Sequence, residues 1–453
     1  MKQKRNYLKI TIGIAVLAIP LLVSAQQDSG TRNLSLQDAI TMSIKHSGRL
    51  KIDEAKVEES AAALREAKDD RLPNAGVSGA YLRVNKPNVS LKTKLFGSSS
   101  DTTSGGSSSG SPSINQAIYG MANVSLPIFS GGKIRYGIQS AQFLEKAATL
   151  DAAHDRQGLI LNTIDAYVNL YKAFVTVQVV KENLKQSMQR DSVLSRLEET
   201  GLLARNDLLK ARLQTSNIDL EVLDAESNLK LASINMDLML GLPEQTMLVP
   251  DPGAFNQKIA LKNLEAYETT ALQDRNDLQA LTFREKAATA GISIARADLY
   301  PSLALTGGFI AADIPHFLTI SNAVNVGIGV KYDLGSLWKA KSRITQAEAR
   351  RKEVEYSEGI LSDAIRLTIN KDYEDYLLAS RKIEVYDLAV TQAEENYRIT
   401  KNKFDNNLVN TTDLLDANVL LLQSKINLAV ARADMVLAYD HLLQAAGMID
   451  SIN

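Results

Sequence analysis

The chain has 453 residues, of which 45% are hydrophobic and 23% are charged, and its formal net charge is −1. This composition is that of a folded protein and excludes collagen-like and mostly disordered chains. The small net charge also argues against a nucleic-acid partner. The chain has no cysteine and only four histidines, which fall in no short ligand spacing, so the sequence predicts neither a metal site nor a cofactor.

The first 25 residues have the pattern of a secretory signal peptide. Basic residues precede an apolar stretch from Ile10 to Val23, and the run Val23-Ser24-Ala25 fits a signal peptidase site. Removing this segment removes four basic and no acidic residues, which leaves an expected net charge of −5. A single N-terminal membrane anchor is the alternative interpretation.

The rest of the chain contains an internal duplication. Residues 64–79 align with residues 292–307, and residues 201–211 align with residues 407–417. The two matches lie 22 residues further apart in the first half, which also contains a Ser/Gly-rich run. We therefore expect a first structural repeat over 26–241 with a long Ser/Gly loop at 86–117, a linker over 242–261, and a second repeat over 262–453.

The sequences of the two repeats predict the same order of helices and strands. An Ala-rich helix stops before Pro73 or Pro301, because the residue before a proline avoids the helical conformation. Two strands follow, at 75–84 and 118–128 in the first repeat and at 302–311 and 324–333 in the second. Residues 118–128 and 324–333 alternate between apolar and polar positions, as a strand with one apolar face does.

A long helix follows the strands in each repeat. The chain has no proline from about Gly132 to Thr200 or from Leu337 to Phe404, which predicts helices of about 68 residues, on the order of 100 Å long. After a short break, a return helix reaches Gly241 or Gly447. The last helix carries apolar residues at heptad spacing, which predicts a coiled coil; these residues are Leu415, Val419, Leu422, Ile426, Ala429, Ala433 and Val436.

Helices of this length and four amphipathic strands both require partners. A helix of 68 residues cannot sit inside an ordinary globule, and open strand edges do not persist in lipid. The sequence therefore predicts an assembly of several copies, and closure alone allows two, three or four.

The two turn segments, Thr200–Ala211 and Asn406–Ala417, the run Phe129-Ser130-Gly131-Gly132 and the repeated element order resemble the TolC family of outer-membrane efflux and secretion ducts. The resemblance implies a mixed α/β membrane protein with internal duplication. It would form a homotrimer, with a long α-helical periplasmic barrel and a transmembrane β-barrel built from four strands per chain. Residues 26–35, 242–262 and 446–453 would form a belt around the middle.

The function implied by the resemblance is passive conduction through the outer membrane, without catalysis. A periplasmic adaptor and an inner-membrane pump would deliver cargo to the channel of a tripartite efflux or type I secretion system. A soluble periplasmic coiled-coil adaptor or structural protein is the alternative. A secreted hydrolase is disfavoured because no Walker motif or histidine cluster occurs. The sequence does not indicate the cargo.

The resemblance also implies where the adaptor binds. The family's adaptor contacts at the turns fall on Gly201 and Leu202 in the first repeat, and on Asn407 and Leu408 in the second. Asn407 stands where the family has glycine, and asparagine still tolerates the left-handed conformation that a sharp turn requires.

Asp413 and Asp416 match the aspartates that line the family's tunnel entrance. Their i, i+3 spacing places both carboxylates on one face of a helix, so a trimer would carry two stacked rings of three that attract cations. The alternative for Asp413 is a helix cap. Asp207 is expected to act as a cap or hydrogen-bond partner, and Arg205 would substitute for a tip-locking arginine whose position is Val409 here.

Overall fold

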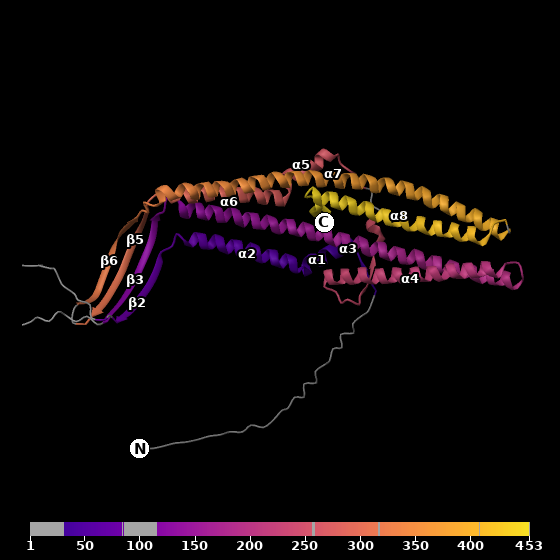
Figure 1. Cartoon of the computed structure of the whole chain (residues 1–453), viewed down its shortest axis with the longest axis horizontal. Helices are drawn as coiled ribbons and strands as arrows, with labels where there is room; N and C mark the ends of the chain where they lie inside the picture. The colour runs from indigo at the N-terminus through magenta and orange to yellow at the C-terminus, as the bar shows by residue number, and fades with distance from the viewer. Residues whose placement is uncertain are drawn as a thin grey trace, which may run out of the picture.

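The computed structural model describes residues 31–83, 85, 116–255, 259–315, 318–406 and 408–452. The expected signal peptide, most of the expected Ser/Gly loop and Asn407 lie outside the described residues. The described chain is elongated, with a sheet at one end, a helical body, and two helical hairpins that end together at the far end (Figure 1).

One antiparallel sheet contains all four predicted hairpin strands, in the order β2-β3-β5-β6. The strands are β2 (Asn74–Arg83), β3 (Gln116–Phe129), β5 (Ser302–Ile314) and β6 (Leu318–Lys331). The predicted apolar face of β6 is exposed: Val324, Val326, Ile328 and Val330 are 73%, 79%, 70% and 67% accessible. Strands β2 and β6 are the two edges, each hydrogen-bonded on one side among the described residues.

The two predicted long helices are α3 (Lys133–Glu199) and α7 (Ser336–Asp405), and each continues from a strand of the sheet. The turn before α3 requires glycine. Gly131 and Gly132 have φ of 62° and 88°, and a Cβ on Gly131 would lie 2.5 Å from the carbonyl oxygen of Ala297.

The helices form a single layer with two long edges. Neighbours follow the order α2 (Gly48–Asp69), α3, α6 (Asn276–Ala297), α7 near the sheet. They follow the order α4 (Arg205–Leu240), α3, α8 (Thr411–Ala445), α7 toward the tips (Figure 1). One edge of the layer is therefore β6 and α7, and the other is β2, α2 and α4.

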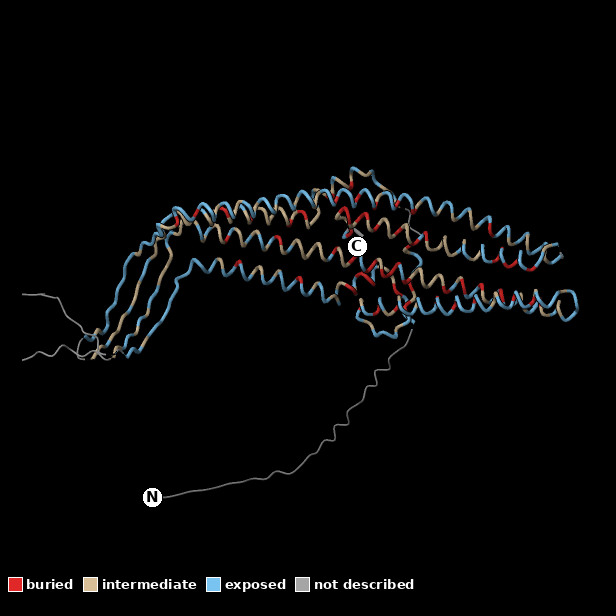
Figure 2. The backbone as a smooth tube through the Cα atoms, viewed as in Figure 1, coloured by how far each residue is buried: buried red, intermediate tan, exposed pale blue. Residues whose placement is uncertain are grey.

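The core is concentrated at mid-length, where short elements pack on the long helices (Figure 2). Strand β1 (Thr31–Leu34) pairs in parallel with β4 (Met247–Pro250), and the hydroxyl of Tyr167 donates to the carbonyl of Leu34 at 2.9 Å. The largest apolar cluster gathers here from α3, α4, β1 and β4, with α1 (Leu36–His46). The segments η1 (Pro252–Phe255) and η2 (Ile449–Ile452) also lie at this level (Figure 1).

The second repeat has its own cluster at the same level. Helix α5 (Leu264–Asp274) contributes Tyr267 and Ala271, which pack with Ile365 and Ile369 of α7 and with Leu442 of α8. Among the described helices, α8 alone is long and apolar enough to cross a membrane by length and composition. It packs instead as the partner of α7 in a hairpin.

Each repeat contains a helix break that the sequence analysis does not predict. The break between α1 and α2 is at Ser47, and the break between α5 and α6 is at Arg275. Gly241 and Gly447, at the ends of the return helices, have φ of 69° and 73°. A Cβ on Gly241 would collide with the ring of His46, and a Cβ on Gly447 would lie 3.1 Å from Arg275 Cγ. In both repeats, therefore, the glycine at the end of the return helix packs against the break between the two shorter helices.

One buried acidic side chain of α4, that of Asp237, has no hydrogen-bond partner among the described residues. Its side chain is fully buried in α4, and neither carboxylate oxygen has a hydrogen-bond partner in the described chain. Burial raises the pKa of the Asp237 carboxyl to about 6.

We expect Asp237→Asn to stabilise the protein at pH 8 and to have little effect at pH 3.5. In the unfolded chain this carboxyl ionises near pH ~4. Since the folded state retains the proton up to about pH 6, the wild type loses stability as pH rises between these values. Thermal unfolding followed by circular dichroism at both pH values measures the difference. Asp219→Asn on the exposed side of α4 is the control, and an equal gain for both variants at pH 8 would contradict the assignment.

Candidate functional site: the paired helical tips

The first tip is a sharp helix end built around Gly201. Its φ is 76°, its amide donates to the Glu198 carbonyl at 2.9 Å, and the Leu202 amide donates to the Leu197 carbonyl at 2.8 Å. These two bonds form a Schellman motif, which ends a helix with a left-handed residue. No atom lies within 4 Å of a Cβ placed on Gly201, so backbone conformation alone favours glycine here.

The second tip ends its helix in a similar way. The Leu408 amide donates to the Lys403 carbonyl at 2.8 Å, the same i to i−5 bond as in the first tip. Asn407 lies outside the described residues. Leu202 and Leu408 are each 72% exposed, so both tips present a leucine to solvent at the same end of the molecule (Figure 1).

Asp413 belongs to a capping box at the start of α8. Its amide donates to Asn410 Oδ1 at 2.9 Å, and its carboxylate accepts from the Asn410 amide at 3.3 Å. Asp416 lies one turn further on the same exposed side and forms no hydrogen bond or ion pair with any described residue. Both carboxylates are therefore directed to solvent, and Asp413 is also part of the cap.

The first tip differs from the expectation for Asp207 and Arg205. The N-cap of α4 is Ala204, which provides no side-chain bond. Asp207 forms an ion pair with Lys210 at 3.7 Å instead, and Arg205 is exposed without a hydrogen bond to a described residue. Neither side chain therefore caps α4 in the described chain, and the roles of Asp207 as a hydrogen-bond partner and of Arg205 as a tip-locking residue stay predictions.

The two tips contact each other through an aromatic side chain that the sequence analysis missed. Phe404 of α7 packs against the apolar cluster of the first hairpin, which contains Leu194, Leu208 and Ala211. A cleft of about 480 Å³ lies between the tips, and its walls include Leu202 and Asp207 of the first and Val409 and Thr411 of the second.

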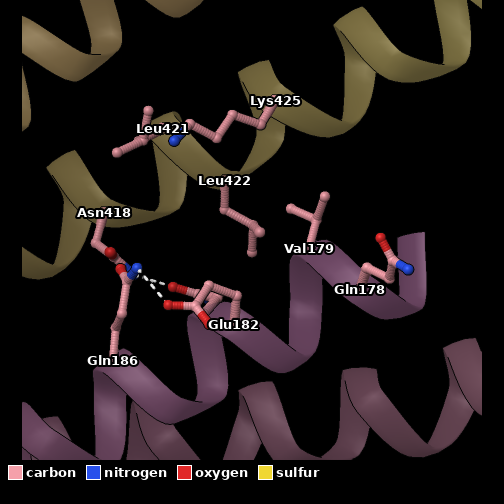
Figure 3. A pocket seen from close by; sticks show the side chains of 9 residues that line it. Gln178, Val179, Glu182, Gln186, Asn418, Leu421, Leu422 and Lys425 are labelled. Atoms are coloured by element: carbon pink, nitrogen blue, oxygen red, sulfur yellow. Dashed lines mark hydrogen bonds between the residues drawn. The ribbon is translucent and has the colours of Figure 1, made fainter. Parts of the chain in front are cut away.

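The seam between the two hairpins also contains buried polar contacts. Asn418 Nδ2 of α8 donates to Asn183 Oδ1 of α3 at 2.7 Å, and both side chains are buried. A cleft of about 240 Å³ beside this pair is lined by Glu182 and Gln186 of α3 and by Leu422 of α8 (Figure 3). Single polar residues on long helices resemble solvent-facing positions, so the sequence carried no signal for this pairing.

The polar seam continues toward the belt. Lys172 of α3 forms an ion pair with Asp434 of α8, and His441 Nε2 lies 3.2 Å from Asp165 Oδ1. The hydrogen bond with Asp165 raises the pKa of the His441 imidazole, whereas burial raises the pKa of the adjacent Asp440 carboxyl to about 7. Among the described residues, no cluster of three or more His, Asp or Glu side chains could hold a metal ion.

Comparison with known proteins gives a consistent result. The model of the outer membrane efflux protein family matches residues 39–242 and 269–448. Outer membrane protein TolC of Vibrio cholerae is 26% identical over 327 residues, which cover 69% of this chain and 73% of that protein. Alkaline protease secretion protein AprF of Pseudomonas aeruginosa is 22% identical, with 65% of this chain and 62% of that protein covered.

A solved structure shares the fold. The outer membrane protein VceC of Vibrio cholerae superposes with a TM-score of 0.73 at 19% identity, over 91% of this chain and 96% of that chain. The order of long helices, sheet and paired tips is therefore an architecture already seen in an outer-membrane protein.

Proposed function

Since the chain belongs to the outer membrane efflux protein family, we propose that three copies close into one tube that conducts cargo passively across the outer membrane. The protein is an outer-membrane channel for efflux or secretion, and its helical part extends into the periplasm. We further propose that a periplasmic adaptor and an inner-membrane pump supply the cargo and that the channel itself performs no catalysis.

The observation that carries the proposal is the pair of unsatisfied edges. In an antiparallel sheet of four strands the two edge strands run in opposite directions, so β6 of one copy can pair with β2 of the next and remain antiparallel. A head-to-tail contact of this kind closes into a ring when the rotation between neighbouring copies divides a full turn. The closed sheet would leave no strand edge with unpaired amides and carbonyls in lipid, where no water can bind them. The number three comes from the family resemblance.

The helical edges support the same closure. Helices α4 and α7 lie at opposite edges of the layer, and each carries an exposed row of apolar residues. In a ring, α4 of one copy would pack against α7 of the next and remove both rows from water. The rows include Leu209, Leu213, Leu220 and Leu231 on α4 and Ile360, Leu367, Leu378 and Val385 on α7.

We expect Val326→Arg to prevent assembly in membranes. Val326 is 79% exposed in the apolar row of β6, and a lipid-facing arginine at mid-depth costs about 2–4 kcal/mol. The measurement is the fraction of heat-modifiable trimer in an outer-membrane fraction. Asn325→Arg, on the opposite face of β6, is the matched control and should still assemble. Equal assembly of both variants would exclude lipid contact at Val326.

The exposed leucine of each tip is proposed as an adaptor contact. The chain has no cysteine, so Leu202→Cys or Leu408→Cys introduces one unique thiol for a photo-crosslinker. We expect mass spectrometry of cross-linked cells to identify a periplasmic adaptor for both variants but not for Lys352→Cys on the side of α7. Recovery of no periplasmic protein from either tip variant would refute the contact.

The carboxylates of Asp413 and Asp416 are proposed to ring the tunnel entrance. We expect the variant Asp413→Asn with Asp416→Asn to reduce cation preference and block by multivalent cations, measured as reversal potential and conductance in planar bilayers. An asparagine oxygen at 413 can still accept the Asn410 amide, so the cap is retained while the charge is removed. Asp219→Asn is the control, and unchanged selectivity of the double variant would place these carboxylates away from the ion path.

A further inference from the structure

The junction between β6 and α7 exposes the single tryptophan of the chain. Trp338 is 69% accessible, and its neighbours Leu334 and Leu337 are 62% and 55% accessible. The Trp338 ring lies back over the first turn of α7, with Cζ2 3.7 Å from the position of a Cβ on Gly335. Trp338, Leu334 and Leu337 together form an exposed apolar patch, and such a patch points to a partner outside the described chain.

The same junction carries unpaired positive charge. Lys331, Lys339 and Lys341 are exposed, and none forms an ion pair with a described residue. The nearby Lys133 and Arg343 differ, because both bind Asp298, at 3.1 Å and 2.8 Å. The carboxylate of Asp333 accepts the Gly335 amide at 2.9 Å. The junction therefore combines apolar side chains with three lysines that form no ion pair with a described residue, beside one carboxylate, that of Asp333.

The junction follows the end of β6, whose row of exposed apolar residues would face lipid in the proposed barrel. The exposed apolar row of β6 runs from Val324 to Val330 and continues beyond the strand with Tyr332, which is 39% exposed, and Leu334 at the junction. The eight steps from Val324 to Tyr332 span about 27 Å along the chain, or about 20 Å in height at a strand tilt of about 40°, which is close to the height of an outer-membrane apolar band of about 25 Å. Tryptophan prefers the boundary between hydrocarbon and headgroups, and lysines just beyond it attract anionic headgroups.

We propose that Leu334, Leu337, Trp338, Lys339 and Lys341 form a collar that binds anionic phospholipid in the leaflet nearest the helices. Trp338 and the two leucines occupy the boundary of the hydrocarbon, and the two lysines bind headgroup phosphates. This inference rests on the proposed insertion of the sheet into the membrane and adds a specific lipid contact on its helical side.

The test uses Trp338 as an intrinsic probe in the full chain, reconstituted in vesicles of zwitterionic phospholipid with or without phosphatidylglycerol. We expect the emission to shift to shorter wavelength on insertion. Phospholipids brominated near the headgroup end of the acyl chain should quench it more than lipids brominated at the chain terminus. In the variant Trp338→Phe with Tyr356→Trp, the probe lies 18 residues along α7, about 27 Å from the collar. We expect aqueous iodide to quench the tryptophan emission of this variant and brominated lipid to leave it unchanged.

The lysines are tested separately. We expect Lys339→Gln with Lys341→Gln to weaken the preference for brominated phosphatidylglycerol over the zwitterionic lipid by about fivefold per lysine. The control is Lys352→Gln with Lys382→Gln, two exposed lysines further along α7, which should retain the preference.

Three outcomes would overturn the proposal. In the first, the protein floats with the vesicles and conducts, but Trp338 remains accessible to iodide, which leaves the proposed channel intact and removes the collar. In the second, the emission is already at short wavelength in detergent and brominated lipid has no effect, which means that a second copy covers Trp338. In the third, the protein does not insert at all, which overturns the channel as well.

Discussion

The backbone hydrogen bonds at the two sheet edges constrain this protein more than any other feature. In water, the free amides and carbonyls of β2 and β6 could bind solvent, but in a bilayer they have no such partner. A single copy cannot satisfy them, because a four-stranded sheet is too narrow to close on itself. The helical layer has the same need for a partner, because α4 and α7 carry exposed apolar rows, and the proposed closure would cover strands and helices together.

The distribution of polar and apolar contacts then determines which parts stay together. Within each hairpin the helices pack through apolar side chains, such as Val180 against Ile218 and Val222. Between the hairpins, polar pairs such as Asn183 and Asn418 accompany apolar contacts such as that of Phe404. Separating the hairpins would therefore break buried polar pairs as well as expose apolar side chains.

The sequence predicted the long helices and strands because these depend on periodic patterns and on the absence of proline. Residues 324–333 alternate cleanly, and β6 is found there. The helix breaks at Ser47 and Arg275 were not predicted, because they depend on glycines about 170 to 195 residues away that pack against them. Phe404 was missed for a similar reason, since one aromatic residue in a helix does not reveal which other element it contacts. The heptad seam of α8 holds at Ala433 and Val436, whereas Val419 is 42% exposed because α8 packs against both α7 and α3.

The concentration of the core at mid-length has a mechanical consequence. From Tyr167 to the end of α3, about 32 residues continue as one helix, which corresponds to a rigid arm of roughly 48 Å. A rotation of about 5° at the belt displaces the end of such an arm by roughly 4 Å, comparable to the movements seen in packed helices that switch between states. In the proposed tube, the core at mid-length would therefore act as a pivot, and side chains that touch neither cargo nor adaptor would affect how wide the far end is.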